Sequence, residues 1–275
     1  MIYSESEEGA RMYGTEPKER PNPVSLGCCS RMLGLLLSAG VLVGSCGCGS
    51  ERIDTSPIKS AWESYPSEHF VFYYPPDSPR KSRMTSFAAS CEEIFTHVVG
   101  VLQVEPDEQI DFFVLTTDVQ SDSLLGRPAG FFAPALPAIF LRIGQHPGGF
   151  VARAGCYFID KKTSSFEVLK TGMYQLYARP SVNVHAATFG FERKNRFISL
   201  VELANTKLVK DPAVYETEAA SLCAFLLARH GPEPFKMLWR SVLGFTESIE
   251  RIYGVELGEF EKQWQEYYRR ESGRT

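Results

Sequence analysis

The fold class follows from a strand–helix–strand pattern that begins with HFVFYY at residues 69–74. This stretch is aromatic and β-branched and has prolines on both sides, so we expect a β-strand. Between Met84 and Leu102, apolar residues recur at steps of three and four. That spacing predicts an amphipathic helix of about five turns, packed on a core. IDFFVL at residues 110–115 predicts a second strand.

The rest of the chain changes gradually from strand to helix patterns. AIFL at residues 138–141 predicts a strand. Apolar spacing predicts a helix over residues 166–177, in which Gly172 is a mild flaw because glycine lowers helix propensity. Further helices are expected over residues 215–226, 235–242 and 257–267. Strands and one helix followed by helices predict an α+β fold, in which a small N-terminal sheet with a long packed helix precedes a mainly helical C-terminal half.

An apolar run near the N-terminus resembles the core of a signal peptide. Residues 33–43 are apolar or small, and Arg31 precedes them. The run is too short to cross a bilayer, which takes about 20 residues. Val43-Gly44-Ser45-Cys46 resembles a bacterial lipobox, so we expect Cys46 to be lipidated and to hold the chain at a membrane surface. The alternatives are an ordinary secretory signal that is cut elsewhere, or a buried core helix.

These features divide the chain into three parts. Residues 1–45 are assigned to an N-terminal extension and a lipoprotein-type signal peptide, residues 46–62 to a polar tether, and residues 63–272 to a single domain. The expected location is the bacterial cell envelope, with the domain on the periplasmic or extracellular face. The first thirty residues are long and partly acidic for a signal peptide, so a start at Met12 is an alternative.

Composition narrows the possible partners. The 275-residue chain is 44% hydrophobic and 23% charged, which rules out wholesale disorder. Its net charge of −4 implies no strongly basic face, so we expect no nucleic-acid partner. The cysteines of the domain are widely spaced among apolar residues, and we expect buried thiols rather than disulfides at Cys91, Cys156 and Cys223.

Short patterns typical of catalytic sites do not combine into one. SxxK, KTG and SxN patterns, known from penicillin-binding enzymes, occur at residues 56–59, 78–81, 170–172 and 181–183. In those enzymes SxN precedes KTG, whereas here it follows KTG. KTG should also lie on a strand, but here it falls in a helical pattern. No two histidines have the HExxH spacing that would place two zinc ligands one helical turn apart. We interpret Glu92, Glu93 and His97 as a solvated helix face rather than a carboxylate–imidazole group.

Two C-terminal segments and the order of elements resemble a known family. The segments are FLLARHGPEPF at residues 225–235 and YGVELGEFEKQWQEYY at residues 253–268, and PAG at residues 128–130 precedes an apolar strand. Over about residues 68–269, the chain resembles peptidase MA-like domains of the gluzincin type, which often occur in bacterial envelope proteins. The resemblance implies a zincin-like fold with its central helix over residues 166–177.

The family's catalytic motif is absent from that helix. Lys170-Thr171-Gly172-Met173-Tyr174 occupies the place of HExxH, so both imidazoles and the general-base Glu are missing. The alignment implies that His185 replaces the third ligand. One imidazole cannot hold catalytic zinc, which takes three protein ligands and a water. The resemblance therefore implies a cleft that has lost its chemistry, with no metal and no other cofactor.

Three hypotheses follow. The first is an envelope lipoprotein whose non-catalytic domain binds an envelope protein or peptide, at a cleft between the sheet and helix 166–177 that contains Tyr174 and His185. The second is an active hydrolase with an unorthodox metal or acid–base site. Its candidate residues are His185 with Glu167 or Glu202. The third is a purely structural protein, which predicts a filled cleft without convergent polar groups.

Overall fold

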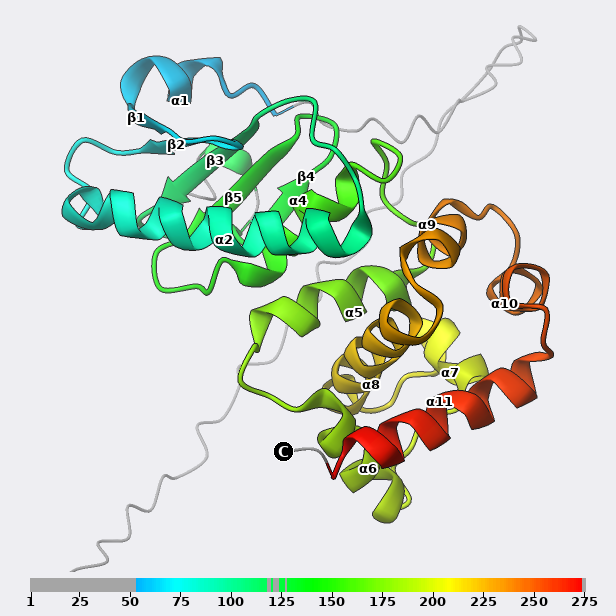
Figure 1. Ribbon diagram of the computed structural model, residues 1–275. Helices are drawn as coiled ribbons and strands as arrows, with labels where there is room; N and C mark the ends of the chain where they lie inside the picture. The colour runs from blue at the N-terminus through cyan, green and yellow to red at the C-terminus, as the bar shows by residue number, and fades with distance from the viewer. Residues whose placement is uncertain (1–52, 118–119, 121–123, 127, 274–275) are drawn as a thin grey trace, which may run out of the picture. The chain divides into compact units, whose positions relative to one another are not determined.

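A computed structural model describes residues 53–117, 120, 124–126 and 128–273 (Figure 1). Cys46 and the signal-like run lie outside these residues. The protein has the predicted α+β fold, with a five-stranded mixed sheet followed by a mainly helical half. No helix among the described residues is long and apolar enough to span a membrane.

The sheet has the strand order β1-β2-β3-β5-β4. Its strands are β1 (Glu63–Pro66), β2 (Phe70–Tyr74), β3 (Ile110–Leu115), β4 (Phe131–Ala133) and β5 (Ala138–Arg142). The three inner strands run parallel, and both edge strands are antiparallel to their neighbours. The predicted strands are thus confirmed, whereas β1 and β4 were not predicted, because strands of three or four residues are too short to show a period.

Helix α2 (Met84–Leu102) covers one face of the sheet and has the predicted bounds (Figure 1). Its apolar stripe, which includes Cys91 and Phe95, packs against a cluster of strand aromatics that includes Phe70 and Phe112. A 3₁₀ turn, η1 (Lys81–Arg83), leads into it. The free thiols of Cys91, Cys156 and Cys223 are all buried, as predicted.

The opposite face of the sheet shows that the predicted tether overlaps the fold. Helix α1 (Ser56–Ala61) begins with a proline in its first turn, where the missing N–H costs nothing. Its Ile58 is buried in a cluster with Phe113 and Phe140 from the sheet. Trp62 packs on the same cluster, and Lys59 Nζ lies 2.6 Å from Asp111 Oδ2 of β3. The packed chain therefore begins before residue 63.

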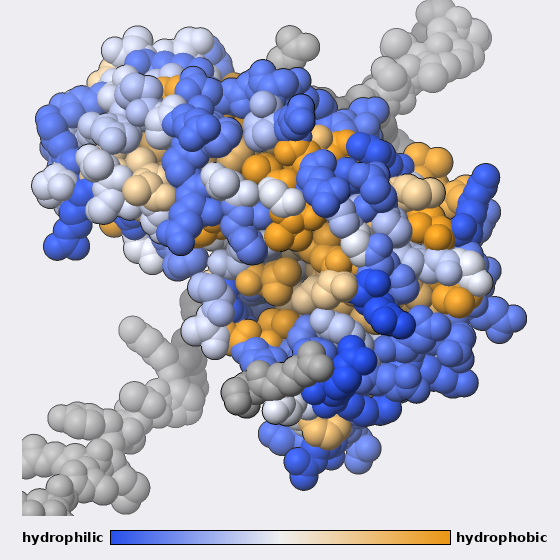
Figure 2. Space-filling model, in the orientation of Figure 1, coloured by the Kyte–Doolittle hydropathy of each residue, from blue (hydrophilic) through white to orange (hydrophobic). Residues whose placement is uncertain are grey.

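The helical half is built around a central helix, α8 (Pro212–Phe225), which packs against α5, α6 and α11. The other elements are α4 (Gly148–Tyr157), α5 (Glu167–Ala178), α6 (Val184–Arg193), α7 (Leu200–Ala204), η2 (Thr206–Leu208), η3 (Leu226–His230), α9 (Pro232–Arg240), α10 (Phe245–Tyr253) and α11 (Leu257–Glu271). The face seen in Figure 2 is largely hydrophilic, with hydrophobic surface gathered toward its middle, so the polar sides of most helices on this face meet solvent.

One prediction about the helices in this half was wrong. Val242 was expected to continue the buried stripe of Phe235 and Leu238, but it is 94% exposed. The reason is that α9 ends at Arg240 and Ser241 adopts an extended conformation. A different surprise is the Pro147-Gly148-Gly149 segment: its composition is typical of a turn, but Gly148 and Gly149 begin helix α4.

Glycines allow α5 to approach both of its neighbours closely. A Cβ on Gly149 of α4 would lie 2.5 Å from the ring of Tyr174. A Cβ on Gly172 of α5 would lie 2.3 Å from the carbonyl oxygen of Ala219 in α8. Gly172 is therefore a packing requirement rather than the mild flaw that its helix propensity suggests.

Candidate functional site

A cavity of about 230 Å³ lies where helices α4, α5 and α8 meet the loop before β4. Its lining residues are Gly130, Phe150, Arg153, Glu167, Lys170, Thr171, Tyr174, Gln175 and Glu216. Three of these, Lys170, Thr171 and Tyr174, are the positions that the family resemblance places at the catalytic motif. They share one face of α5 because residues at i, i+1 and i+4 lie on adjacent rows of a helix. A cavity therefore lies beside helix 166–177, but helices α4 and α8 and the loop before β4 line it, rather than the sheet that was expected to form its other side.

The charges around this cavity are paired, with one exception. Lys170 Nζ lies 2.6 Å from Glu167 Oε2, and an Arg179 guanidinium nitrogen lies 3.3 Å from Glu216 Oε2. Arg153, which α4 contributes, makes no hydrogen bond or ion pair with any part of the chain that the structure describes. Among the described residues, Arg153 is thus the lining cation without an ion-pair partner, and its guanidinium can bind a ligand.

An aromatic wall closes one side of the cavity. Phe150 and Tyr174 meet edge to face, with ring centroids 5.0 Å apart. Burial raises the pKa of the Tyr174 phenol, and the nearby Arg153 only partly opposes this shift. The phenol is therefore protonated at neutral pH and can donate a hydrogen bond.

His185 lies elsewhere, so the expectation that it shares the cleft with Tyr174 was wrong. It belongs to α6, and its Nδ1 lies 3.0 Å from the Oγ of Ser221 in α8. Trp264 Nε1 donates to the same oxygen at 3.1 Å. Burial lowers the pKa of His185, so the imidazole is neutral at pH 7. Ser221 is fully buried, and no substrate can reach its hydroxyl in this conformation.

The two carboxylates proposed as partners of His185 are engaged in other contacts. Glu167 forms the ion pair with Lys170 described above, and Glu202 forms a capping box with Ser199 at the start of α7. Within the described ranges, no three His, Cys, Asp or Glu side chains are grouped so that they could hold a metal ion. The structure therefore does not bring together the residues of the unorthodox-site hypothesis.

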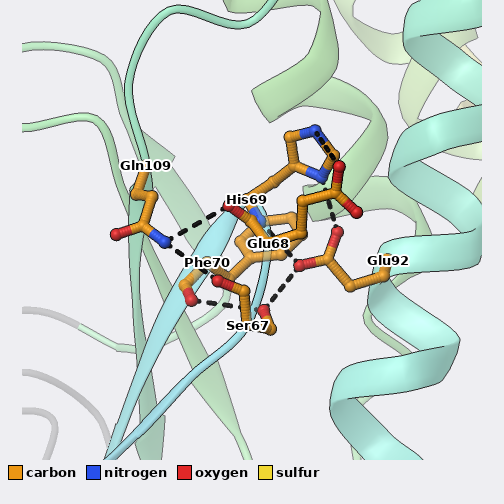
Figure 3. A network of polar contacts seen from close by, with 6 residues as sticks. All are labelled: Ser67, Glu68, His69, Phe70, Glu92 and Gln109. Carbon is orange, nitrogen blue, oxygen red and sulfur yellow. Dashed lines mark hydrogen bonds and ion pairs between the residues drawn. The ribbon is translucent and has the colours of Figure 1, made fainter.

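A second polar network ties the β1–β2 turn to helix α2 (Figure 3). Glu92 of α2 accepts hydrogen bonds from Ser67 Oγ at 2.5 Å and from the backbone N–H of His69 at 2.8 Å. His69 Nδ1 lies 2.7 Å from the other Glu92 oxygen, Oε2. Gln109 donates to the carbonyl oxygens of Ser67 and Glu68. Both Ser67 and His69 bind the carboxylate rather than each other, so the group is a structural clamp and not a nucleophile–base pair.

The clamp yields a first prediction. Burial would raise the pKa of Glu92, but the hydrogen bonds from Ser67 and His69 outweigh it and lower the pKa. The carboxylate thus stabilises the fold at neutral pH, and this contribution is lost as the pH falls through the lowered pKa. Glu92→Ala should reduce the free energy of unfolding at pH 7 by about 2 kcal/mol, measured by chemical denaturation.

The neighbouring exposed residue supplies the control for this measurement. Glu93→Ala removes a carboxylate of the same type from the solvent face of α2 and should change stability little. Equal effects of the two substitutions would show that the clamp does not stabilise the fold.

Comparisons of the sequence with known proteins identify no family for this chain. No protein-family model matches the sequence, and no curated protein matches it.

The sequence did not single out Arg153, although a weak signal was present. It is the one charged residue within FVARAGCYF at residues 150–158. A lone charged side chain in an apolar segment must reach a polar partner or solvent, because burying an unpaired charge is costly. Here the Arg153 side chain reaches the cavity.

Proposed function

We propose that this protein is a membrane-anchored lipoprotein of the bacterial cell envelope whose domain binds a partner without catalysing a reaction. The observation that best supports this proposal is the cavity beside α5. Its lining includes Lys170, Thr171 and Tyr174, the positions that the family resemblance assigns to the zinc-binding motif. An ammonium, an alcohol and a protonated phenol are hydrogen-bonding groups and not the usual ligands of catalytic zinc.

The state of the cavity also favours binding over a purely structural role. A structural protein would be expected to fill this space with side chains, whereas about 230 Å³ remains open. Several polar groups from three helices converge on it, and Arg153 lacks a partner among the described residues. These features suit recognition of a polar group.

The anchor would keep this domain close to a membrane. Cys46 is the proposed lipidated residue, and the described chain begins at Ile53. Even fully extended, the chain between them reaches only about 25 Å. A partner would therefore have to be another component of the envelope at that surface.

The test uses the full-length chain, expressed in a bacterium. We expect the wild type in the membrane fraction and the Cys46→Ser variant in the soluble fraction. Protein purified in detergent should contain far less than one zinc per chain and should leave casein intact. Near-stoichiometric zinc that is lost in His185→Ala, or casein cleavage that is lost in that variant, would overturn the non-catalytic assignment.

A further inference from the structure

The shape and lining of the cavity constrain the ligand further, and this step rests on the proposed binding function. Ligand pockets for whole small molecules usually exceed about 300 Å³. A cavity of about 230 Å³ can enclose one or two amino-acid residues. It therefore suits the end or a side chain of a larger partner better than a complete cofactor.

The unpaired groups that line the cavity are mainly hydrogen-bond donors. Arg153 has no partner in the part of the chain that the structure describes, and neither does the amide of Gln175. Tyr174 adds a protonated hydroxyl from the adjacent face of α5. The lining acids, Glu167 and Glu216, each already face a cation. The group that would complete this set is an anion with several acceptor atoms.

The chemistry of Arg153 selects the kind of anion. A guanidinium is planar and binds a carboxylate through two parallel hydrogen bonds. The aromatic wall formed by Phe150 and Tyr174 provides an apolar surface for the carbon atoms next to such a carboxylate. Two carboxylates in the lining would repel a more highly charged anion.

We infer that this cavity binds a carboxylate of a peptide, held by Arg153 and flanked by Tyr174 and Gln175. The carboxylate belongs either to the peptide's C-terminus or to an acidic side chain. Capture of a chain end by a few converging donors is a recurring mode of peptide recognition, and it requires no hydrolysis of the peptide.

Three acetylated tripeptides distinguish the two sources of the carboxylate. The probes are acetyl-Ala-Ala-Ala with a free carboxylate, the same peptide as its amide, and acetyl-Ala-Ala-Glu as its amide. Each is titrated into the detergent-solubilised full-length protein by isothermal titration calorimetry. We expect one or both carboxylate-bearing peptides to bind at least about tenfold more tightly than the neutral amide.

Variants of Arg153 show whether the cavity is the site. Arg153→Gln should weaken binding of the carboxylate peptide at least about tenfold. Arg251→Gln, at an exposed position on α10, is the matched control and should leave binding unchanged. Should Arg153→Gln unfold, Arg153→Lys retains the charge without the planar fork and should give intermediate binding.

The outcomes separate this inference from the proposed function. Equal binding of all three peptides, wild-type binding by Arg153→Gln, or no binding of either carboxylate peptide would overturn the carboxylate assignment and leave a non-catalytic domain in place. Mass spectrometry of the peptides after titration tests whether the protein hydrolyses them. Cleaved peptide would instead overturn the proposed function.

Discussion

Replacing Gly172 by alanine should destabilise the protein by about 3 kcal/mol, the upper end of what overpacking costs. The added Cβ would lie 2.3 Å from the carbonyl oxygen of Ala219 and 2.4 Å from the Sγ of Cys223. A backbone oxygen cannot rotate away as a side chain can, so α5 would have to move off α8. For a domain of this size, the expected fall in melting temperature is about 10 °C.

Gly190 provides the control for this prediction. It lies inside helix α6, and a Cβ there would meet no atom within 4 Å. Gly190→Ala should stabilise the protein by up to about 1 kcal/mol, because alanine is the better helix former. If Gly172→Ala raised the melting temperature as Gly190→Ala does, the close crossing of α5 and α8 would be refuted.

The second large effect concerns the fully buried Glu218 of α8. Burial raises the pKa of its carboxyl to about 8, and Glu261 and Glu192 add to the shift, whereas the hydrogen bond from the Ile198 N–H opposes it. Between the usual pKa near 4.5 and this value, the folded state binds a proton that the unfolded state has released. The free energy of unfolding must therefore fall as the pH rises through this range. The loss attributable to Glu218 is at most about 5 kcal/mol.

Glu218→Gln should remove this pH dependence. The amide carbonyl can still accept the hydrogen bond that Ile198 donates to Glu218 Oε2 at 3.1 Å. The variant should match the wild type in stability near pH 5 and exceed it by several kcal/mol near pH 8, as measured by urea unfolding at each pH. Glu247→Gln, at an exposed position on α10, should follow the wild-type profile. Parallel profiles for wild type and Glu218→Gln would contradict the burial of this carboxyl.

Local periodicity was enough to predict the elements that have one buried and one solvated face. Helix α2 has the predicted bounds, and the apolar stripe of α11 includes Phe260 and Trp264 as expected. Such patterns can be read from sequence because the core and the solvent select different residue types at a helical or strand spacing.

Helix α4 was missed because it lacks such contrast. Nine of its ten residues are buried, and Arg153 is the exception. A helix that is covered on nearly all sides has no polar face, so no helical period appears. Its first two residues, Gly148 and Gly149, have a composition typical of a turn. The structure shows instead that Tyr174 and Tyr177 approach them so closely that only glycine fits.

The candidate site was predicted in part, through the family resemblance rather than through local periodicity. The resemblance assigned Lys170, Thr171 and Tyr174 to the motif positions of one helix, and these residues line the cavity. Arg153 and Glu216 come from other helices, and nothing in their local sequence specifies which cavity they meet. His185 was misplaced because its position relative to α5 depends on how α6 packs against α8 and α11.

The sequence by itself therefore determined the α+β class, the main helices and strands and the buried thiols. Only the tertiary structure decided that Gly172 is a contact point, that Arg153 has no ion-pair partner among the described residues and that Glu218 is buried. A residue's own neighbours in the chain encode which side of an element is apolar. The identity of what covers that side depends on contacts between residues far apart in sequence, which local patterns do not specify.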